Sequence, residues 1–335
     1  MSRPEGDLAI SHAGRVGTVV TEELEPAPET PKEIIGRSPW ELFWRQFRRD
    51  RFALAGLVFV AIMIALGLGA GIFADITGHG PNDVNLRALD EFGLPSGLRS
   101  DYWFGVDSAG RDLFVRVLYG ARTSLIIAFF ATGLGLVIGA TAGLTAGFYR
   151  GRVDTLLSRT MDVVLALPIL LLALGLAAAC GTTKEGCLGG LIKPGLFLIS
   201  LIIGLFNWPY LARIVRGQVL SIREKEFIEA SRSLGSSNRR IIFREILPNV
   251  AAPIIVYTTL IIPSNILFEA ALSFLGVGVP DQTPSWGAML SQAGDAFTYA
   301  PWLMIFPGLF LFLTTLAFNL VGDGLRDALD PRTSA

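Results

Sequence analysis

Six long apolar runs constrain this chain more than any other feature of its sequence. None of them contains a charged residue, and each is close to or above the ~20 residues that a helix needs to cross a hydrocarbon core of ~30 Å. Only 17% of all residues are charged, against about 25% in soluble domains. The sequence therefore predicts an all-α, polytopic membrane protein with six transmembrane helices, in residues 52–74, 123–148, 163–183, 194–212, 246–268 and 296–322.

The lysines and arginines predict the side on which each connection lies. Most of the 28 precede the first run, follow the second, follow the fourth or follow the sixth. Because cytoplasmic connections carry an excess of Lys and Arg, both termini are expected in the cytoplasm, N-in and C-in. The chain then divides into a disordered tail (1–38), an interfacial amphipathic helix (39–51), a transmembrane domain (52–322) with an external loop (75–122) and a cytoplasmic loop (216–248), and a cytoplasmic tail (323–335).

The two segments before the first span have distinct compositions. Residues 1–38 are rich in Glu and Pro and cannot bury enough apolar surface to offset the entropy of ordering. The following helix has arginines on one side and an aromatic stripe on the other, the pattern of a helix that lies at the bilayer surface. The stripe consists of Trp40, Phe43, Trp44 and Phe47.

Most of the cytoplasmic loop, residues 223–248, is densely charged yet patterned. Small and apolar side chains recur at the spacing of one helical face: Phe227, Ala230, Ser231 and Leu234. Gly235 is expected to end this helix in a left-handed conformation, and Ser236 or Ser237 to cap a second helix, which Pro248 is expected to end. The prediction is a helix–turn–helix with one face free for a partner.

The sequence contains no recognisable catalytic apparatus. Its four lysines do not follow glycine, so it has no GxxxxGK[ST] phosphate-binding loop. Its two histidines, His12 and His79, are too few and too far apart for a His-rich metal site. No basic patch with interleaved aromatic residues indicates nucleic-acid binding. We therefore expect neither an enzyme nor a metal-binding protein.

Three side chains near the predicted outer side have more than one interpretation. Glu269 should lie close to the outer interface, either as a hydrogen-bonded structural group or as a substrate contact. Cys180 and Cys187 fall in the connection between the third and fourth spans, where the compartment is oxidising. They form either a disulfide that closes a short loop or two free thiols.

The patterned cytoplasmic segment resembles the EAA loop of bacterial ABC importer permeases, whose pattern is E-A-A-x3-G-x9-I-x-L-P. Two positions depart from it: Ser231 replaces the second alanine, and Glu245 replaces the isoleucine. Serine is small like the alanine it replaces, so Ser231 is counted as a match. The matching positions are Glu229, Ala230, Ser231, Gly235, Leu247 and Pro248.

Other segments resemble the C-type permease of the dipeptide/oligopeptide/nickel branch. Residues 267–280, 283–290 and 319–332 are similar to hallmarks of that branch. So is the stretch 104–125, whose matching residues on the external loop include Asp107, Gly110, Arg111, Asp112, Arg116 and Arg122.

The resemblance implies a multi-pass permease subunit in the cytoplasmic (inner) membrane of a bacterium. Such a subunit lies in the lipid bilayer, pairs with a B-type permease as a heterodimer, and forms half of a path for dipeptides or oligopeptides. Two ATPase subunits, which use ATP and Mg, would bind the EAA loop, and an extracytoplasmic binding protein would deliver substrate. This chain would bind no cofactor of its own.

Two alternatives stay open. The first is a permease of the same family for nickel or another small solute. The second is a stand-alone, ion-coupled secondary transporter, which needs paired ionisable groups near the bilayer midplane. The spans offer almost none apart from Glu269, so the second alternative is the weaker.

Overall fold

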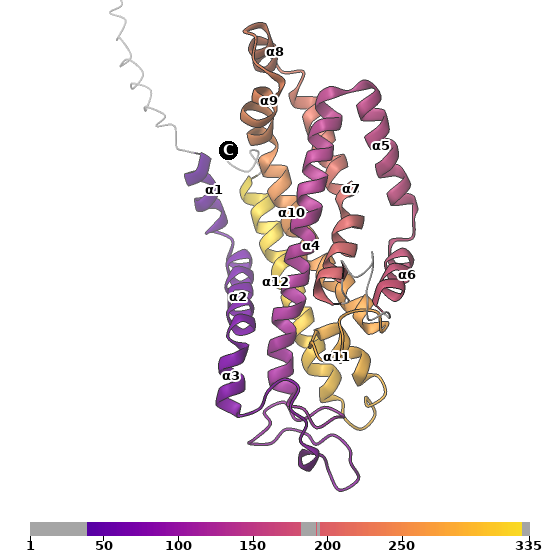
Figure 1. The fold of residues 1–335 in the computed structure, drawn as a ribbon. Helices are drawn as coiled ribbons and strands as arrows, with labels where there is room; N and C mark the ends of the chain where they lie inside the picture. Colours follow the sequence, from indigo (N-terminus) through magenta and orange to yellow (C-terminus); the bar gives the residue numbers. More distant parts are fainter. Residues whose placement is uncertain (1–38, 182–191, 193–194, 330–335) are drawn as a thin grey trace, which may run out of the picture. The chain divides into compact units, whose positions relative to one another are not determined.

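The computed structural model describes residues 39–181, 192 and 195–329, and the predicted N-terminal tail lies outside them. The described residues form a bundle of helices (Figure 1). Five helices are long and apolar enough to cross a membrane, and a bent pair brings the number to six if it is one span. This result agrees with the predicted all-α fold and its six spans. The five helices are α2 (Arg51–Leu68), α4 (Leu113–Tyr149), α7 (Leu196–Ile222), α10 (Leu247–Phe274), which continues the helix from Asn238, and α12 (Trp302–Leu329).

Helix α4 is the longest single element and packs against most of the others. Its 37 residues extend over about 55 Å, which exceeds the hydrocarbon thickness. The predicted span began at residue 123, but the helix begins at Leu113. The side chain of Asp112 caps this earlier start by accepting a hydrogen bond from the Val115 amide at 3.2 Å. Residues 113–122 of the predicted external loop are therefore helical.

Glycines allow α4 and α7 to approach closely. Gly135, Gly139, Gly143 and Gly147 recur every four residues and so share one face of α4. A Cβ atom on Gly143 would lie 2.6 Å from the Ala212 carbonyl oxygen, and one on Gly139 would lie 2.7 Å from that of Trp208. This spacing of small residues is how helices pack backbone to backbone inside membranes.

The predicted third span, 163–183, contains a bend between two helices, α5 (Gly151–Ala166), which begins before the predicted span, and α6 (Ile169–Gly181). Their axes differ by 81° across the break at Leu167 and Pro168. Proline lacks an amide hydrogen and disfavours helical backbone in the residue before it. Leu167 accordingly has an extended conformation, with φ −79° and ψ 139°.

Pro248 does not end a helix, contrary to the sequence expectation. Short helix α9 (Asn238–Arg240) leads into π-helical turns at Ile241–Ile246, which continue directly into α10. In these wider turns the Leu247 amide donates to the Ile242 carbonyl, five residues earlier. Pro248 then stands in the first turn of α10, where its missing amide hydrogen disturbs the ladder least.

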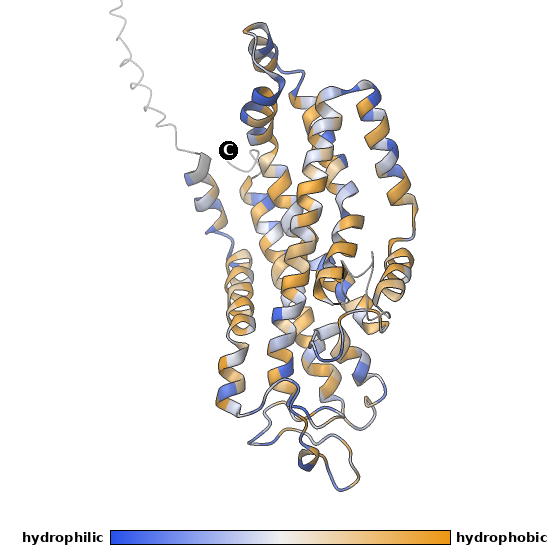
Figure 2. Ribbon diagram, viewed as in Figure 1, coloured by the Kyte–Doolittle hydropathy of each residue, from blue (hydrophilic) through white to orange (hydrophobic). Residues whose placement is uncertain are grey.

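Polar and charged residues gather at the two ends of the bundle, and apolar residues dominate between them (Figure 2). One end carries α1 (Pro39–Phe47), α8 (Glu226–Ser233), the α4–α5 turn and the end of α12 (Figure 1). The opposite end carries α3 (Ala70–Thr77), the connection 78–112 with the short 3-10 helix Leu86–Ala88, and α11 (Trp286–Ala293). We call these the α8 end and the α11 end. Residues 323–329 of the predicted C-terminal tail belong to α12.

Candidate functional site

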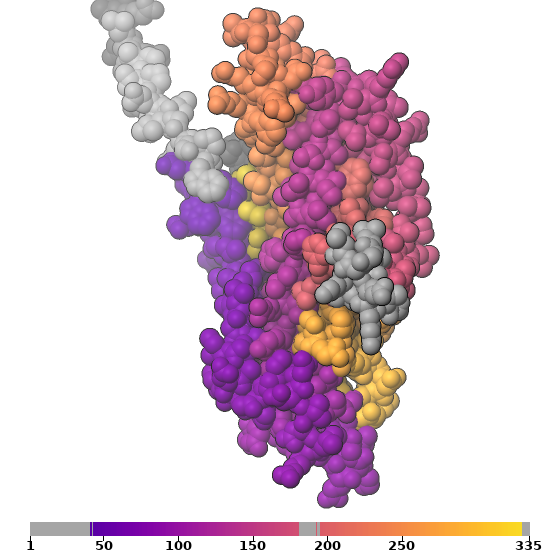
Figure 3. Space-filling view, in the orientation of Figure 1, coloured from indigo at the N-terminus to yellow at the C-terminus, as the bar shows by residue number. Residues whose placement is uncertain are grey.

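Helix α8 presents most of its surface to solvent at the α8 end. Its buried side chain is Ile228, which joins an apolar cluster with Phe148, Val219, Ile241 and Ile246. On its other faces, Phe227 is 44% exposed and Leu234, directly after the helix, is 87% exposed. Glu229 and Ala230 are exposed as well. In Figure 3 this segment projects from the bundle.

The turn after α8 has the geometry expected of a glycine cap. Gly235 has φ +78°, a left-handed conformation that other residues adopt at a cost. The Gly235 amide donates to the Arg232 carbonyl at 2.9 Å, and the Ser236 amide donates to the Ser231 carbonyl at 3.1 Å. This pair of bonds is a Schellman motif. The Ser237 hydroxyl then caps α9 by accepting a hydrogen bond from the Arg240 amide.

Three contacts attach this segment to the end of α4. Arg223 donates to the Phe148 carbonyl at 2.6 Å, and the Arg232 guanidinium lies 5.5 Å from the centre of the Phe148 ring. Arg150 and Glu224 form an ion pair at 2.6 Å. Burial, and the nearby charges of Arg150 and Arg232, lower the pKa of Arg223. A displacement of α8 would therefore act on α4 as well as on α10. Of the remaining predicted residues, Leu247 is half-buried and Pro248 is exposed at the start of α10.

At the α11 end, Asp107 organises the turn that precedes α4. Its Oδ1 accepts hydrogen bonds from the backbone amides of Ala109 and Arg111, each at 2.9 Å. Its Oδ2 accepts from Arg111 Nε at 2.7 Å and lies 3.4 Å from Arg116 Nε. Gly110 closes this turn with φ +77°. Asp107, Gly110, Arg111 and Arg116 of the 104–125 signature thus form one buried structure.

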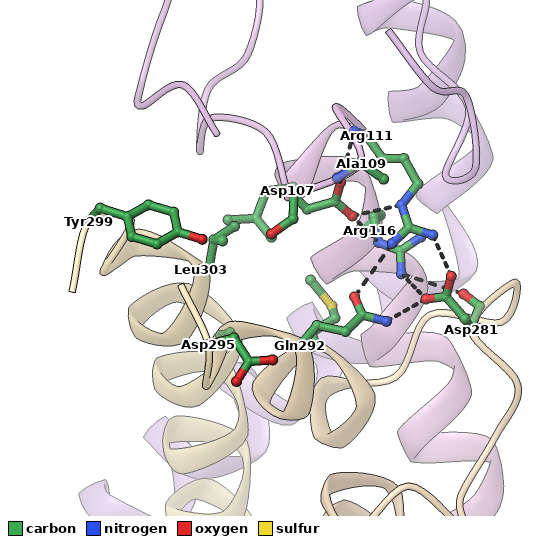
Figure 4. Close-up of a pocket in the computed structure, with 13 residues that line it drawn as sticks. Asp107, Ala109, Arg111, Arg116, Asp281, Gln292, Asp295, Tyr299 and Leu303 are labelled. Atoms are coloured by element: carbon green, nitrogen blue, oxygen red, sulfur yellow. Dashed lines mark hydrogen bonds and ion pairs between the residues drawn. The ribbon is translucent and has the colours of Figure 1, made fainter. Parts of the chain in front are cut away.

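The same arginines reach residues far away in the sequence (Figure 4). Arg111 Nη1 lies 2.8 Å from Asp281 Oδ2, and Arg116 Nη2 lies 3.5 Å from Asp281 Oδ1. Gln292 donates to the Asp281 carboxylate. The pKa of Asp281 lies below its ordinary value, because the hydrogen bonds from Arg111 and Gln292 outweigh the effect of burial. Arg111 thus joins the connection 78–112 to Asp281, in the segment before α11, and to Gln292 in α11.

A cavity of about 560 Å³ opens beside this cluster. Arg111, Arg116 and Asp281 line one side, and Asp295 and Tyr299 line the opposite side (Figure 4). Its volume falls in the range of ~300–1,000 Å³ that is common for small-ligand sites. The cavity is polar on its arginine side and open to the surface of the α11 end.

The other signature residues have different surroundings. Asp112 is buried and accepts, besides the cap bond, a contact from His79 Nδ1 at 3.1 Å. Burial raises the pKa of the Asp112 carboxyl, although hydrogen bonds from Val115 and His79 oppose the shift. Arg122 is exposed on α4, away from the cavity lining.

Glu269 is fully buried inside the bundle. Ser124 donates to one carboxyl oxygen at 2.9 Å, and Ser273 donates to the other at 2.7 Å. The Ser124 bond joins α4 to α10, the Ser273 bond lies within α10, and both favour the structural interpretation of Glu269 over a substrate contact. Asn265, one turn earlier, bridges Thr132 and Asn207 by hydrogen bonds of 2.8 and 2.6 Å. Buried polar groups inside the spans are thus used to join helices.

The two cysteines are not both described. Cys180 is buried near the end of α6, and Cys187 lies outside the described residues. The choice between a disulfide and two thiols stays a prediction. Among the described residues, no group of three or more His, Cys, Asp or Glu side chains could hold a metal ion.

Sequence reasoning missed three residues of the α11 end. Asp281 and Gln292 complete the ion-pair cluster, and Trp286 is fully buried and donates its indole N–H to the Val117 carbonyl at 3.1 Å. Trp286 lies inside the hallmark stretch 283–290, and Asp281 falls in the two-residue gap between two hallmark stretches. The position of Trp286 inside a hallmark stretch, and of Asp281 beside one, was the sequence signal that could have identified them.

The chain was compared with known protein families. Residues 135–335 match the family of binding-protein-dependent transport system inner membrane components. Residues 38–92 match the N-terminal transmembrane domain of oligopeptide transport permease C.

Individual proteins agree with these matches. The dipeptide transport system permease protein DppC of Alkalihalophilus pseudofirmus is 39% identical over 92% of this chain and 96% of its own. The glutathione transport system permease protein GsiD is 40% identical in Pectobacterium atrosepticum (88% of this chain, 92% of that protein) and 42% in Escherichia coli O157:H7 (88% and 91%). A chain of the inward-facing MetNI methionine ABC transporter has the same fold, with a TM-score of 0.52 at 18% identity. The match covers 65% of this chain and 98% of the MetNI chain.

The chain therefore belongs to the family of binding-protein-dependent transport system inner membrane components. Its relatives and its N-terminal domain place it among the C-type permeases of the dipeptide and oligopeptide branch of ABC importers, as the motifs predicted. It is a transport subunit, and ATP hydrolysis belongs to the partner subunits of such importers.

Proposed function

We propose that this chain forms half of the path by which an ABC importer takes up dipeptides or oligopeptides, and that α8 couples the path to the ATPases. The observation that carries the proposal is the surface of α8, where exposed Phe227 and Leu234 flank the small residue Ala230. Exposing large apolar side chains to water is unfavourable. A cleft in a partner protein would bury the side chains of Phe227 and Leu234. Phe243, on the π-helical turns, is also exposed, at 62%.

Glu229 supplies the polar part of this interface. It is exposed and has no ion pair with any described residue. It would pair with a basic group of the ATPase, while Ala230 allows close approach. Closure of the nucleotide sites would then move α8, and with it α4 and α10, as rigid bodies.

The arrangement of the segments supports a cytoplasmic location for α8. The Arg-rich segments around α1, the α4–α5 turn and α8 all lie at the α8 end (Figure 1). With that end in the cytoplasm, both termini are inside, as the positive-inside bias predicts. The α11 end would then face the binding protein, with the ion pairs of Asp107, Arg111 and Asp281 holding the external connection in place.

The cargo follows from the relatives, which are named for dipeptide and glutathione transport. The proposed assembly contains a B-type permease, two ATPase subunits that bind ATP and Mg, and an extracytoplasmic binding protein, in the inner membrane of a bacterium. Transport by this chain alone, without ATPases, would instead support a secondary transporter.

The proposal is tested by purifying the assembled complex and measuring ATP hydrolysis with and without substrate-loaded binding protein. Gly235→Asp and Glu229→Lys are expected to insert normally and to abolish the stimulated hydrolysis. Gly78→Asp is the matched control, because Gly78 also caps a helix with φ +71° and has open space around it, but it follows α3 at the other end. Normal stimulation in the Gly235→Asp complex would contradict the proposal.

A further inference from the structure

The two positions at which the EAA loop departs from the family pattern lie in contact with each other. Ser231 stands in place of an alanine, and Glu245 in place of an isoleucine. The Ser231 hydroxyl donates to Glu245 Oε1 at 2.5 Å, across 14 residues of sequence. Ser236 Oγ lies 3.3 Å from Ser231 Oγ and completes a small polar group at the turn.

The serine at position 231 and the glutamate at position 245 depend on each other, because each supplies the hydrogen-bond partner of the other. An alanine and an isoleucine at these positions would make an apolar contact, whereas serine and glutamate make a hydrogen bond to a charged group, the stronger class of such bonds. Glu245 Oε2 is already buried without a hydrogen-bond partner among the described atoms. Losing Ser231 would therefore leave a partly buried carboxylate with no donor from α8.

The contact joins two elements that have few other connections. Helix α8 has only eight residues and is too short to hold its conformation alone in water. Ile228 is its buried apolar anchor. Glu245 belongs to the π-helical turns that continue into α10. The Ser231–Glu245 bond thus connects the helix that would meet the ATPase to a membrane-spanning helix.

We propose that Ser231 and Glu245 form a clasp that makes α8 and the start of α10 move as one body. They are positioning residues for coupling, and this role rests on the proposed function, in which α8 docks on an ATPase. Without the clasp, the packing of Ile228 on Ile241 and Ile246 would be the remaining link from α8 to α10, and more of a force on α8 would deform the turn at Gly235. With the clasp in place, a displacement of α8 moves the start of α10 directly.

A double-mutant cycle in the complete complex tests the clasp. The variants are Ser231→Ala, Glu245→Ile and the double variant, which restores the family pattern at both positions. The readouts are substrate-stimulated ATP hydrolysis per co-purified ATPase and peptide transported per ATP. Losing a hydrogen bond to a charged group predicts a decrease in peptide per ATP on the order of ten-fold for Ser231→Ala. A smaller decrease is expected for Glu245→Ile, because the freed Ser231 hydroxyl is partly open to water.

Rescue is the distinguishing result. The double variant is expected to return to within about two-fold of the unaltered complex, since apolar contact replaces the hydrogen bond. Thr155→Ala removes a hydroxyl that bonds only within its own helix, to the Gly151 carbonyl, and should change nothing. Normal coupling in both single variants, or a double variant as impaired as the product of the two, would overturn the clasp. A complex without ATPase, or without stimulation in the unaltered chain, would overturn the proposed function and the clasp together.

Discussion

Replacing Gly143 with alanine is expected to destabilise the packing of α4 on α7, whereas the same replacement at Gly133 is not. Both residues lie inside α4, Gly133 near its middle and Gly143 six residues before its last residue, Tyr149. A Cβ atom on Gly143 would lie 2.6 Å from the Ala212 carbonyl oxygen and 2.7 Å from Val215 Cβ. No atom lies within 4 Å of the corresponding position on Gly133.

The expected change in the free energy of unfolding follows from two opposing effects. Relieving a contact of this kind requires the helices to separate by about 1 Å, because carbon atoms prefer ~3.5–4.0 Å. Overpacking of this size costs about 1–3 kcal/mol. Alanine also favours the helix by about 1 kcal/mol over glycine. Both variants share this gain, so their difference in unfolding free energy isolates the contact, at about 1–3 kcal/mol.

The assay is unfolding of the purified protein in mixed micelles with increasing SDS, followed by the loss of helical circular dichroism. Gly133→Ala should unfold at the same SDS fraction as the unaltered protein or a higher one, and Gly143→Ala at a lower one. Equal stability of the two variants would refute the close approach of α4 and α7.

Two further predictions concern the α11 end and the cysteines. Because the pKa of Asp281 is lowered in the fold, its contribution is present above the unfolded pKa of about 3.9 and is lost as pH falls through the folded value. Asp281→Asn should therefore cost up to about 1 kcal/mol at neutral pH, since the carboxylate is half-exposed. The cost should shrink as pH falls below the unfolded pKa, and a pH-independent difference in melting temperature would contradict this. If Cys180 and Cys187 form a disulfide, maleimide labelling of the denatured protein should require prior reduction, and equal labelling with and without reductant would rule the disulfide out.

Much of the fold could be predicted because apolar length and charge are local properties. The uncharged runs identified the five long apolar helices, although not all of their ends, and Gly235 identified the turn after α8. The start of α4 at Leu113 could not be predicted, because Arg116 and Arg122 are typical of a loop in composition. The packed structure explains why a charged residue is buried in the first turn of that helix, because Arg116 lies in contact with Asp107 and Asp281.

The candidate site was predictable where one segment carries it. The EAA loop is contiguous, so its helix and cap followed from spacing. The ion-pair cluster at the α11 end joins residues 170 positions apart, and no local pattern pairs Arg111 with Asp281. Pro248 was expected to end a helix because proline breaks the α-helical ladder, yet the π-helical turns before it provide another geometry. Glu269 had two interpretations in the sequence, and its partners Ser124 and Ser273 required the packed structure.

The central claim is that α8 meets an ATPase subunit, and photo-cross-linking tests it most directly. A benzophenone amino acid replaces Ala230 on the exposed side of α8 in the complete complex, and in a second protein it replaces Tyr299, which is 45% exposed at the α11 end. On illumination, position 230 is predicted to give a permease–ATPase adduct and position 299 to give none. An ATPase adduct from position 299, with none from position 230, would contradict the claim.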